Sequence, residues 1–265
     1  MDAKTFLGME PVGDDRHWRL EVDNRLITPG QFLYGGCGLG AALVALEKAS
    51  GRPTIWATAQ YLSYASPGEV LDLEVDLAVV GGRVTQGRAV AHVGDREVLT
   101  VNAALGTNEL DVGGVWVKMP DVPSPEDCPP RRLPEHVRNT VFEQIDTRVA
   151  LGRTFEDIDG TPGTPDTAMW ARLPGHIEPS AATLAIFGDY VSGGVANPVG
   201  RRVMGRSLDN TIRMVQAEET EWVLLDIRMH ALVNGYAQGI GYMWSESGNL
   251  LATASQSLAI KLWNE

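Results

Sequence analysis

Cysteines, basic residues and long apolar runs are all scarce in this chain of 265 residues. The two cysteines, Cys37 and Cys128, form neither a CxxC pair nor a disulfide-rich pattern, which favours a reducing compartment, and we expect a cytoplasmic protein. Lys and Arg number 22 against 34 Asp and Glu, and the charge of −12 opposes a broad basic surface. No run approaches the ~20 apolar residues of a membrane span, and the N-terminus lacks a signal-peptide layout. We therefore expect no membrane span and no nucleic-acid partner.

Three common patterns of metal, cofactor and serine-nucleophile sites are also missing. The five histidines show no H-x-x-x-H or H-E-x-x-H spacing, so the sequence predicts no metal site. The run GCGLGA at 36–41 imitates a dinucleotide-binding glycine pattern, but no acidic residue follows about 20 positions later to hold a ribose. The run GRSLD at 205–209 ends in Asp, where the nucleophile elbow of an α/β-hydrolase has Gly. We therefore expect no cofactor and no α/β-hydrolase.

Two helices rich in small and apolar residues interrupt an otherwise strand-like sequence. Residues 36–50 predict one helix, ended by Gly51, and residues 181–191 predict another, with Ser180 as its N-cap. Strand-like runs cover 17–22, 54–64, 70–80, 83–92 and 97–105 in the first half, and 141–150, 169–173, 208–215, 222–233, 236–244 and 250–262 in the second. Residues 119–134 hold six prolines, which is typical of a linker.

The second half of the chain repeats the order of the first. At a constant offset of 153 residues twelve pairs are identical, about double the number that chance pairing gives. These identities alone are weak evidence for a repeat. The offset also aligns predicted helix with predicted helix, strand with strand and turn glycine with turn glycine, without an insertion. We infer an α+β fold with two tandem copies of an antiparallel sheet, each wrapping a long helix. The predicted units are residues 1–118 and 141–265, joined by a proline-rich linker at 119–140.

Asp189 lies in the apolar run 184–191 of the second predicted helix. A carboxylate in such surroundings must reach a polar partner or be largely neutral, because burying an unpaired charge is costly. The offset of 153 pairs Asp189 with Gly36, Ser207 with Thr54, and Gln256 with Ala103. Only the second copy is polar at all three positions, and a carboxylate, a hydroxyl and an amide that converge can hold and polarise one water. Taken singly, each has a simpler interpretation: a helix edge, a turn hydroxyl and an exposed strand residue.

Four short motifs resemble those of one family in their order along the chain. They are Tyr34-Gly-Gly36, Phe187-Gly-Asp189, Arg206-Ser-Leu-Asp-Asn210 and Ala254-Ser-Gln256. Together they resemble the type II acyl-CoA thioesterases, which are double-hotdog proteins, over residues 26–262. The resemblance implies an enzyme that hydrolyses acyl-CoA to free fatty acid and CoA through a water oriented by Asp189, Ser207 and Gln256. Two departures bear on the substrate more than on the reaction: Asn210 stands where His is usual, and residues 254–258 replace a run that usually ends in Gln-Glu-Gly.

The resemblance also implies where the substrate binds. Backbone N–H groups at Gly35 and Gly36, where the first helix starts, would polarise the thioester carbonyl. Arg202 and Arg206 precede the strand that Ser207 is predicted to open, and they are candidate anchors for the CoA phosphates; a solvated basic turn explains them equally well. Hotdog sheets commonly pair in such families, so we expect a homo-oligomer.

Other functions stay open from the sequence. A non-catalytic acyl-CoA or acyl-carrier binding protein, or an esterase on another acyl donor, is compatible with the same fold, because fold does not determine function. A hotdog dehydratase would need a catalytic His with an acidic partner, and neither predicted helix contains a His.

Overall fold

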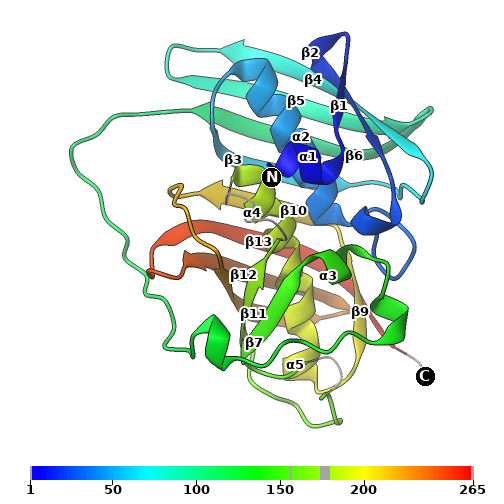
Figure 1. Cartoon of the computed structure of the whole chain (residues 1–265), viewed down its shortest axis with the longest axis vertical. Helices are drawn as coiled ribbons and strands as arrows, with labels where there is room; N and C mark the ends of the chain where they lie inside the picture. The colour runs from blue at the N-terminus through cyan, green and yellow to red at the C-terminus, as the bar shows by residue number, and fades with distance from the viewer. Residues whose placement is uncertain (1, 155–156, 174–179, 264–265) are drawn as a thin grey trace.

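One antiparallel sheet of thirteen strands runs through the part of the chain that the computed structural model describes, residues 2–154, 157–173 and 180–263 (Figure 1). The strand order is β1-β2-β4-β5-β6-β3-β10-β13-β12-β11-β8-β7, and β9 lies beside β13. The strands of the first half are β1 Glu10–Val12, β2 Asp14–Glu21, β3 Thr54–Tyr61, β4 Val70–Val80, β5 Val84–Val93 and β6 Arg96–Gly106. Those of the second half are β7 Asp146–Leu151, β8 Asp166–Arg172, β9 Val203–Ser207, β10 Asp209–Met214, β11 Val223–Val233, β12 Tyr236–Ser245 and β13 Leu250–Leu262.

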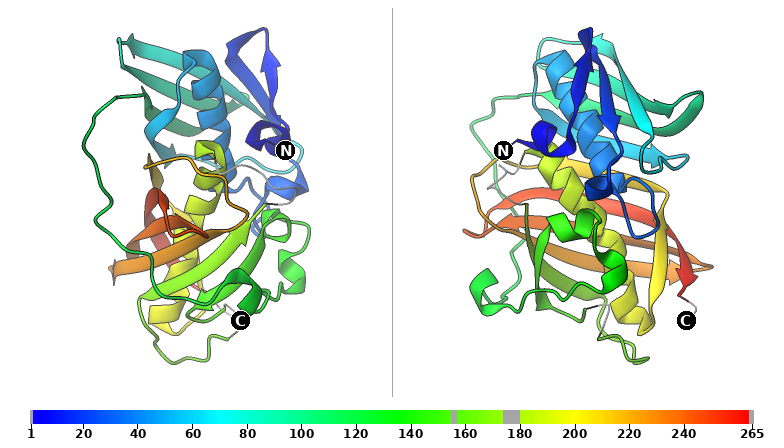
Figure 2. Two further views of the ribbon diagram at one scale, coloured as in Figure 1. Left: turned by 60° about the vertical axis from the view of Figure 1, so that its left-hand side comes forward. Right: turned by 45° about the vertical axis from the view of Figure 1, so that its right-hand side comes forward.

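Two long helical segments lie side by side on one face of this sheet (Figure 2). The first is α2, Gly35–Ser50, and the second is α4, Ala181–Gly188, which continues into η4, Asp189–Val195, and α5, Ala196–Val199. The remaining short helices are α1 Ala3–Leu7, η1 Asn24–Leu26, η2 Pro125–Asp127, η3 Glu135–Val137 and α3 Val141–Gln144. Among the described residues no helix is long and apolar enough to cross a membrane.

The two halves meet at β3 and β10, where a local two-fold axis passes. Thr58 and Thr211 face each other across this pair, with their hydroxyl oxygens 2.8 Å apart. These residues are 153 positions apart, so each stands opposite its own counterpart, which happens only at a two-fold axis. Leu73 of β4 and Leu225 of β11 both face the main core, so these strands are also two copies of one element. The tandem copies predicted from the sequence are therefore present in space, and the chain is an α+β double hotdog.

The prediction that the offset holds without an insertion is wrong. Trp18 pairs with Leu73 and Met169 pairs with Leu225, and all four face the main core, so β2 and β8 correspond at 151 residues and β4 and β11 at 152. The identical pairs Arg19/Arg172 and Leu20/Leu173 are therefore not equivalent positions. The turn between β5 and β6 has two residues, 94–95, whereas that between β12 and β13 has four, 246–249. Loop lengths are free to vary where only the strands must pack.

Two predicted elements have different local structure. The helix predicted over 181–191 is α-helical only to Gly188, and its backbone tightens to a 3-10 helix from Asp189. The predicted strand over 141–150 begins as α3, because the Glu143 carboxylate accepts the N–H of Asn139 at 2.8 Å and stabilises a helical turn. Ser180 caps α4 as predicted, by accepting the N–H of Thr183.

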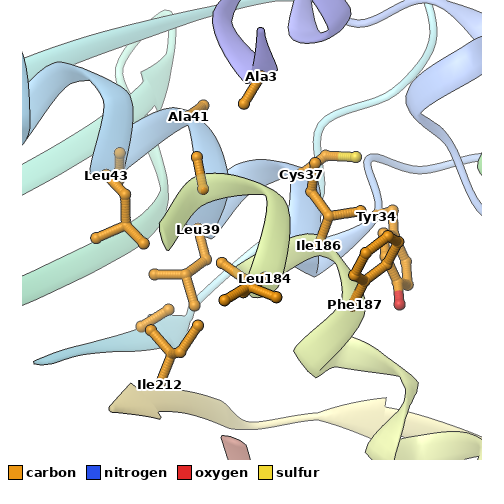
Figure 3. Packing of buried hydrophobic residues seen from close by; sticks show 14 of the residues in the cluster. Ala3, Tyr34, Cys37, Leu39, Ala41, Leu43, Leu184, Ile186, Phe187 and Ile212 are labelled. Carbon is orange, nitrogen blue, oxygen red and sulfur yellow. The ribbon is translucent and has the colours of Figure 1, made fainter. Parts of the chain in front are cut away.

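The main hydrophobic core lies between the two helices and the inner face of the sheet. Leu39 and Leu43 of α2, Leu184 and Ile186 of α4, and Ile212 of β10 are all fully buried and converge in Figure 3. The first half of α2 is rich in glycine, which disfavours a helix, so burial against α4 and the sheet must supply its stability.

A second core covers the outer face of the C-terminal strands. Trp170, Trp222 and Trp244 pack there with Cys128 of the proline-rich segment, and the Trp170 indole N–H donates to the carbonyl of Pro123 at 2.9 Å. Residues 119–134 therefore contain buried groups, and the fully exposed connection is 107–118, seen as the long outer loop in Figure 1. The division into units at 1–118 and 141–265 stays a prediction.

Candidate active site

The end of α4 places Asp189 against β13. A Cβ atom on Gly188, the last residue of α4, would lie only 2.9 Å from the Cβ of Ala254. A glycine at the helix end and an alanine in the strand thus allow this close approach. Ala254 and Gln256 are two residues apart and share the inner face of β13. The packing of α4 on β13 therefore brings Asp189 beside Gln256.

The Asp189 carboxylate is 4% exposed and accepts hydrogen bonds from three neutral groups. Its Oδ1 accepts from the Ser207 hydroxyl at 3.4 Å and from Nε2 of Gln256. Its Oδ2 accepts from the backbone N–H of Gly36 at 2.8 Å. The structure thus brings together the carboxylate, hydroxyl and amide that the sequence singled out, from η4, β9 and β13.

Burial of Asp189 determines its acid strength. Desolvation raises the pKa of this carboxyl to about 6, and the hydrogen bonds from Gly36, Gln256 and Ser207 oppose the rise. Such a group is mostly ionised at neutral pH, yet its pKa is close enough to neutrality for it to take a proton from water and return it. Asp189 therefore has the acidity of a general base.

The orientation of the Gln256 amide follows from its neighbours. Its Oε1 accepts the backbone N–H of Ser192 at 3.0 Å, and the Ser192 hydroxyl donates to the carbonyl of Asp189 at 3.0 Å. Since Oε1 is held by a backbone donor, Nε2 must face Asp189 and the Ser207 hydroxyl, which is 3.3 Å away. The amide thus presents a donor to the carboxylate and hydroxyl.

Ser207 is the last residue of β9, and the prediction that it opens a strand is wrong. Leu208 separates β9 from β10, and its N–H donates to the carbonyl of Ser257 at 2.8 Å. The Asp209 carboxylate in turn accepts the N–H of Ser257 at 2.8 Å. A one-residue break of this kind leaves no mark on the hydrophobic pattern. The two bonds hold the Ser207 turn against β13, one residue beyond Gln256.

The start of α2 contacts Asp189, whereas the sequence predicted that its N–H groups bind the substrate carbonyl. The N–H of Gly36, expected to face the substrate carbonyl, is occupied by Asp189. A Cβ on Gly36 would lie 2.8 Å from the carbonyl oxygen of Ile186, and one on Gly35 would lie 3.0 Å from Asp189 Oδ2. Gly35 is the first residue of the helix, so its N–H has no partner within the helix. The N–H of Gly36 thus holds the Asp189 carboxylate, and Gly35 packs against both this carboxylate and Tyr61.

The two arginines predicted to bind substrate lie near β9. Arg206 precedes Ser207 in that strand, and its guanidinium is 3.5 Å from the hydroxyl of Tyr64. Within the described part of the chain Arg206 makes no ion pair, so its charge is available to an anion. Arg202 lies just before β9 and accepts the N–H of Trp263 through its carbonyl at 2.9 Å.

Four buried polar side chains near Asp189 were not predicted as site residues. They are Tyr34, Tyr61, Tyr190 and Asn210, whose hydroxyl and amide atoms have no hydrogen-bond partner among the described residues. Burial raises the pKa of all three phenols, and the charge of Asp189 adds to the rise, so they stay protonated. The alternation along β3 identifies Tyr61 only as an inward residue, and such a residue is usually part of the core.

Comparisons with known proteins place this geometry in a family. Residues 125–260 match the family model described as the acyl-CoA thioesterase C-terminal domain. A protein of Novosphingobium aromaticivorans described as a thioesterase is similar at 32% identity, with 95% of this chain and 98% of that chain covered and a TM-score of 0.85. No curated protein matches.

Two more distant structures support the fold. A hot dog fold protein from Alicyclobacillus acidocaldarius is 21% identical, with a TM-score of 0.84 over 98% of this chain and 97% of that chain. The acyl-CoA thioesterase II TesB2 from Mycobacterium marinum is 18% identical, with a TM-score of 0.77 over 100% of this chain and 98% of that chain. From the family match over half its length and its 32% identity to a solved thioesterase, the chain belongs to the acyl-CoA thioesterase family.

Proposed function

We propose that this chain is a thioester hydrolase that cleaves acyl-CoA into CoA and a free fatty acid. The observation that carries the proposal is the buried Asp189 carboxylate, held on one oxygen by Ser207 and Gln256. The substrate class is supported by the acyl-CoA thioesterase family, to which the chain belongs. No covalent nucleophile is needed, because a carboxylate of this acidity can activate water directly.

In the proposed mechanism Asp189 is the general base and water is the nucleophile. Ser207 and Gln256 orient the water, and its oxygen attacks the thioester carbonyl carbon while Asp189 accepts its proton. The tetrahedral intermediate then collapses, the C–S bond breaks, and the departing sulfur of CoA takes the proton that Asp189 holds. The products are the acid and the CoA thiol, and Asp189 is again ionised.

The activity test measures CoA thiol release from a panel of acyl-CoA chain lengths as a function of pH. We expect release with at least one chain length, and a rate that falls as pH drops through about 6, because protonated Asp189 cannot accept a proton from water. Above that pH the rate should reach a plateau. Reactions without protein at each pH correct for chemical hydrolysis.

Two results would contradict the proposal. If acyl-CoA raises the thermal stability of the protein without any thiol release, the chain is a binding protein and not a hydrolase. If simple esters are hydrolysed and acyl-CoA is not, the acyl donor is wrong. If the rate instead falls only as the pH drops through about 4, the carboxyl group that acts as the base is not the buried Asp189.

Arg206 is the proposed anchor for the CoA phosphates, with Arg202 beside it. Replacing Arg206 by Ala should raise KM for acyl-CoA several-fold at low salt and leave kcat within about two-fold, since the lost interaction is the same in ground and transition states. The difference between variant and wild type should shrink as salt rises, because salt screens exposed charges. Arg213→Ala, an exposed arginine on β10, is the matched control. A KM for Arg206→Ala that equals that of wild type at every salt concentration removes Arg206 from the anchor.

A further inference from the structure

The thioester carbonyl needs a hydrogen-bond donor that the proposed water-activating residues do not supply. As water adds, negative charge moves from Asp189 to the carbonyl oxygen, and donors aimed at that oxygen stabilise the intermediate. The amide expected for this role, Gly36 N–H, is already bound to Asp189 Oδ2. The donors must therefore come from other groups that face the same space.

Two functional groups lie against Gly35 at once. A Cβ atom on Gly35 would lie 3.0 Å from Asp189 Oδ2, 3.0 Å from the Tyr61 hydroxyl oxygen and 2.9 Å from Tyr61 Cζ. These contacts leave no room for a side chain, so a glycine at this position lets the phenol and the carboxylate lie this close to the start of α2 and to each other. A substrate oxygen that accepts from the Tyr61 hydroxyl would therefore also lie near the Asp189 carboxylate.

The Tyr61 hydroxyl keeps its proton and can donate it. Its oxygen is buried and makes no hydrogen bond of ordinary geometry among the described residues, and the same holds for both polar atoms of the buried Asn210 side chain. Burial and then the Asp189 charge raise the pKa of Tyr61 by more than the nearby Asn210 lowers it, so the proton stays on the oxygen. Buried polar groups are nearly always paired, so polar side chains left without good partners beside a carboxylate indicate the place of a ligand.

We propose that Tyr61 is a catalytic residue whose hydroxyl donates to the thioester carbonyl oxygen, and to the oxyanion that forms as water adds. Gly35 N–H, which has no partner within its own helix because Gly35 is the first residue of α2, is the second donor. The carbonyl oxygen then lies beside the Tyr61 hydroxyl, near the start of α2. As the oxyanion forms, Asp189 takes the proton of water and becomes neutral, so the two groups never bear full negative charge together. This inference rests on the proposed thioester hydrolysis.

The test compares wild type, Tyr61→Phe and Tyr242→Phe in the thiol-release assay. Tyr61→Phe keeps the ring against Gly35 and should lower kcat about 10- to 100-fold with KM within about three-fold, because the lost bond is strongest in the transition state. Tyr242→Phe removes a phenol hydroxyl on the outer face of the sheet, where the ring stacks on Trp244, 6.3 Å between centroids. It should keep kcat within about two-fold of wild type and so controls for the loss of a phenol hydroxyl away from Asp189.

Two CoA analogues separate a catalytic role from a structural one. An S-alkyl-CoA thioether lacks the carbonyl oxygen, so its Kd should be the same in wild type and Tyr61→Phe. The matching trifluoromethyl ketone, whose hydrate imitates the tetrahedral intermediate, should bind Tyr61→Phe about 10- to 100-fold more weakly. If wild type hydrolyses acyl-CoA and Tyr61→Phe retains full kcat, Tyr61 is not a donor to the oxyanion. Equal weakening of both analogues would make Tyr61 a packing residue. If the wild-type protein does not hydrolyse acyl-CoA, the proposed function is wrong, and the proposed role of Tyr61 is wrong with it.

Discussion

Replacing Asp189 by Asn should lower kcat for acyl-CoA hydrolysis by about 100- to 10,000-fold, because the amide cannot accept the proton of the attacking water. Asn has nearly the shape of Asp, so KM should stay within about three-fold. The remaining rate should also lose its dependence on pH near 6, since the group that titrates there is gone. The measurement is thiol release at saturating acyl-CoA from pH 5 to 9.

Thermal unfolding of the same variant distinguishes loss of the base from loss of structure. The pKa of Asp189 is raised in the folded state from an ordinary value of 3.8 to about 6, so between these values the folded protein binds more protons than the unfolded one. Wild-type stability therefore falls as pH rises through this window, and the neutral Asn escapes that loss. We expect the Tm of Asp189→Asn relative to wild type to increase from pH 4 to 7. A variant with full kcat, or one unfolded at pH 7, would contradict the assignment.

The strand bounds were predictable where turns mark them clearly. The sequence predicts β4 and β13 with the bounds that the structure has: β4 lies between two glycine-containing turns, and β13 follows the turn that contains Gly248. The break at Leu208 was not predictable, since one residue outside a strand does not disturb the alternation. The same limit explains why the halves were aligned without an insertion.

The proline-rich segment shows how composition can mislead. Six prolines between 119 and 134 predicted a linker, and the short 3-10 helix η2 is the regular element that the structure has there. Composition does not show that Cys128 is buried beside Trp170, because this contact joins residues over 40 positions apart. The exposed connection lies earlier, at 107–118, where Trp116 is 91% exposed.

The site was predictable in its polar members and not in their surroundings. Asp189, Ser207 and Gln256 could be grouped because each is polar in one copy and small or differently polar in the other. Their roles remain a proposal, but the contacts among them are present. Tyr61 could not be selected, since an inward aromatic residue on a strand is usually core, and only the absence of a hydrogen-bond partner distinguishes it.

The contact between α2 and the second helical segment also explains why position 36 has no carboxylate. The sequence offset of 153 pairs Gly36 with Asp189, and the two are in direct contact, Oδ2 to N–H at 2.8 Å. A carboxylate at both positions would place two like charges against each other in a buried space, which is strongly unfavourable. The helical segments themselves correspond at another offset, since they end at Gly51 and Gly200, both in the left-handed conformation.

The same contact between helices predicts opposite outcomes for one substitution made at two helical glycines. Gly40 lies in α2 and Gly193 lies in η4. A Cβ on Gly40 would lie 2.9 Å from the carbonyl oxygen of Ala182 and 3.4 Å from Cγ1 of Ile186, whereas a Cβ on Gly193 meets nothing within 4 Å. Gly40→Ala should therefore force α2 from α4 and lower the free energy of unfolding by about 1–3 kcal/mol. Gly193→Ala should leave it unchanged or raise it by up to about 1 kcal/mol, because alanine favours helical backbone over glycine.

Urea unfolding of the two variants beside wild type measures these changes, with midpoint and slope fitted separately. Because α2 begins with the glycines that contact Asp189, displacement of α2 in Gly40→Ala should also lower the rate of thiol release, while Gly193→Ala should retain it. Equal stability of the two variants would mean that α2 and α4 are not in tight contact. The contact between Gly36 and Asp189, which depends on this packing, would then also be wrong. A stable Gly40→Ala protein that has lost activity would instead show that the helices separate enough to open the site without unfolding the sheet.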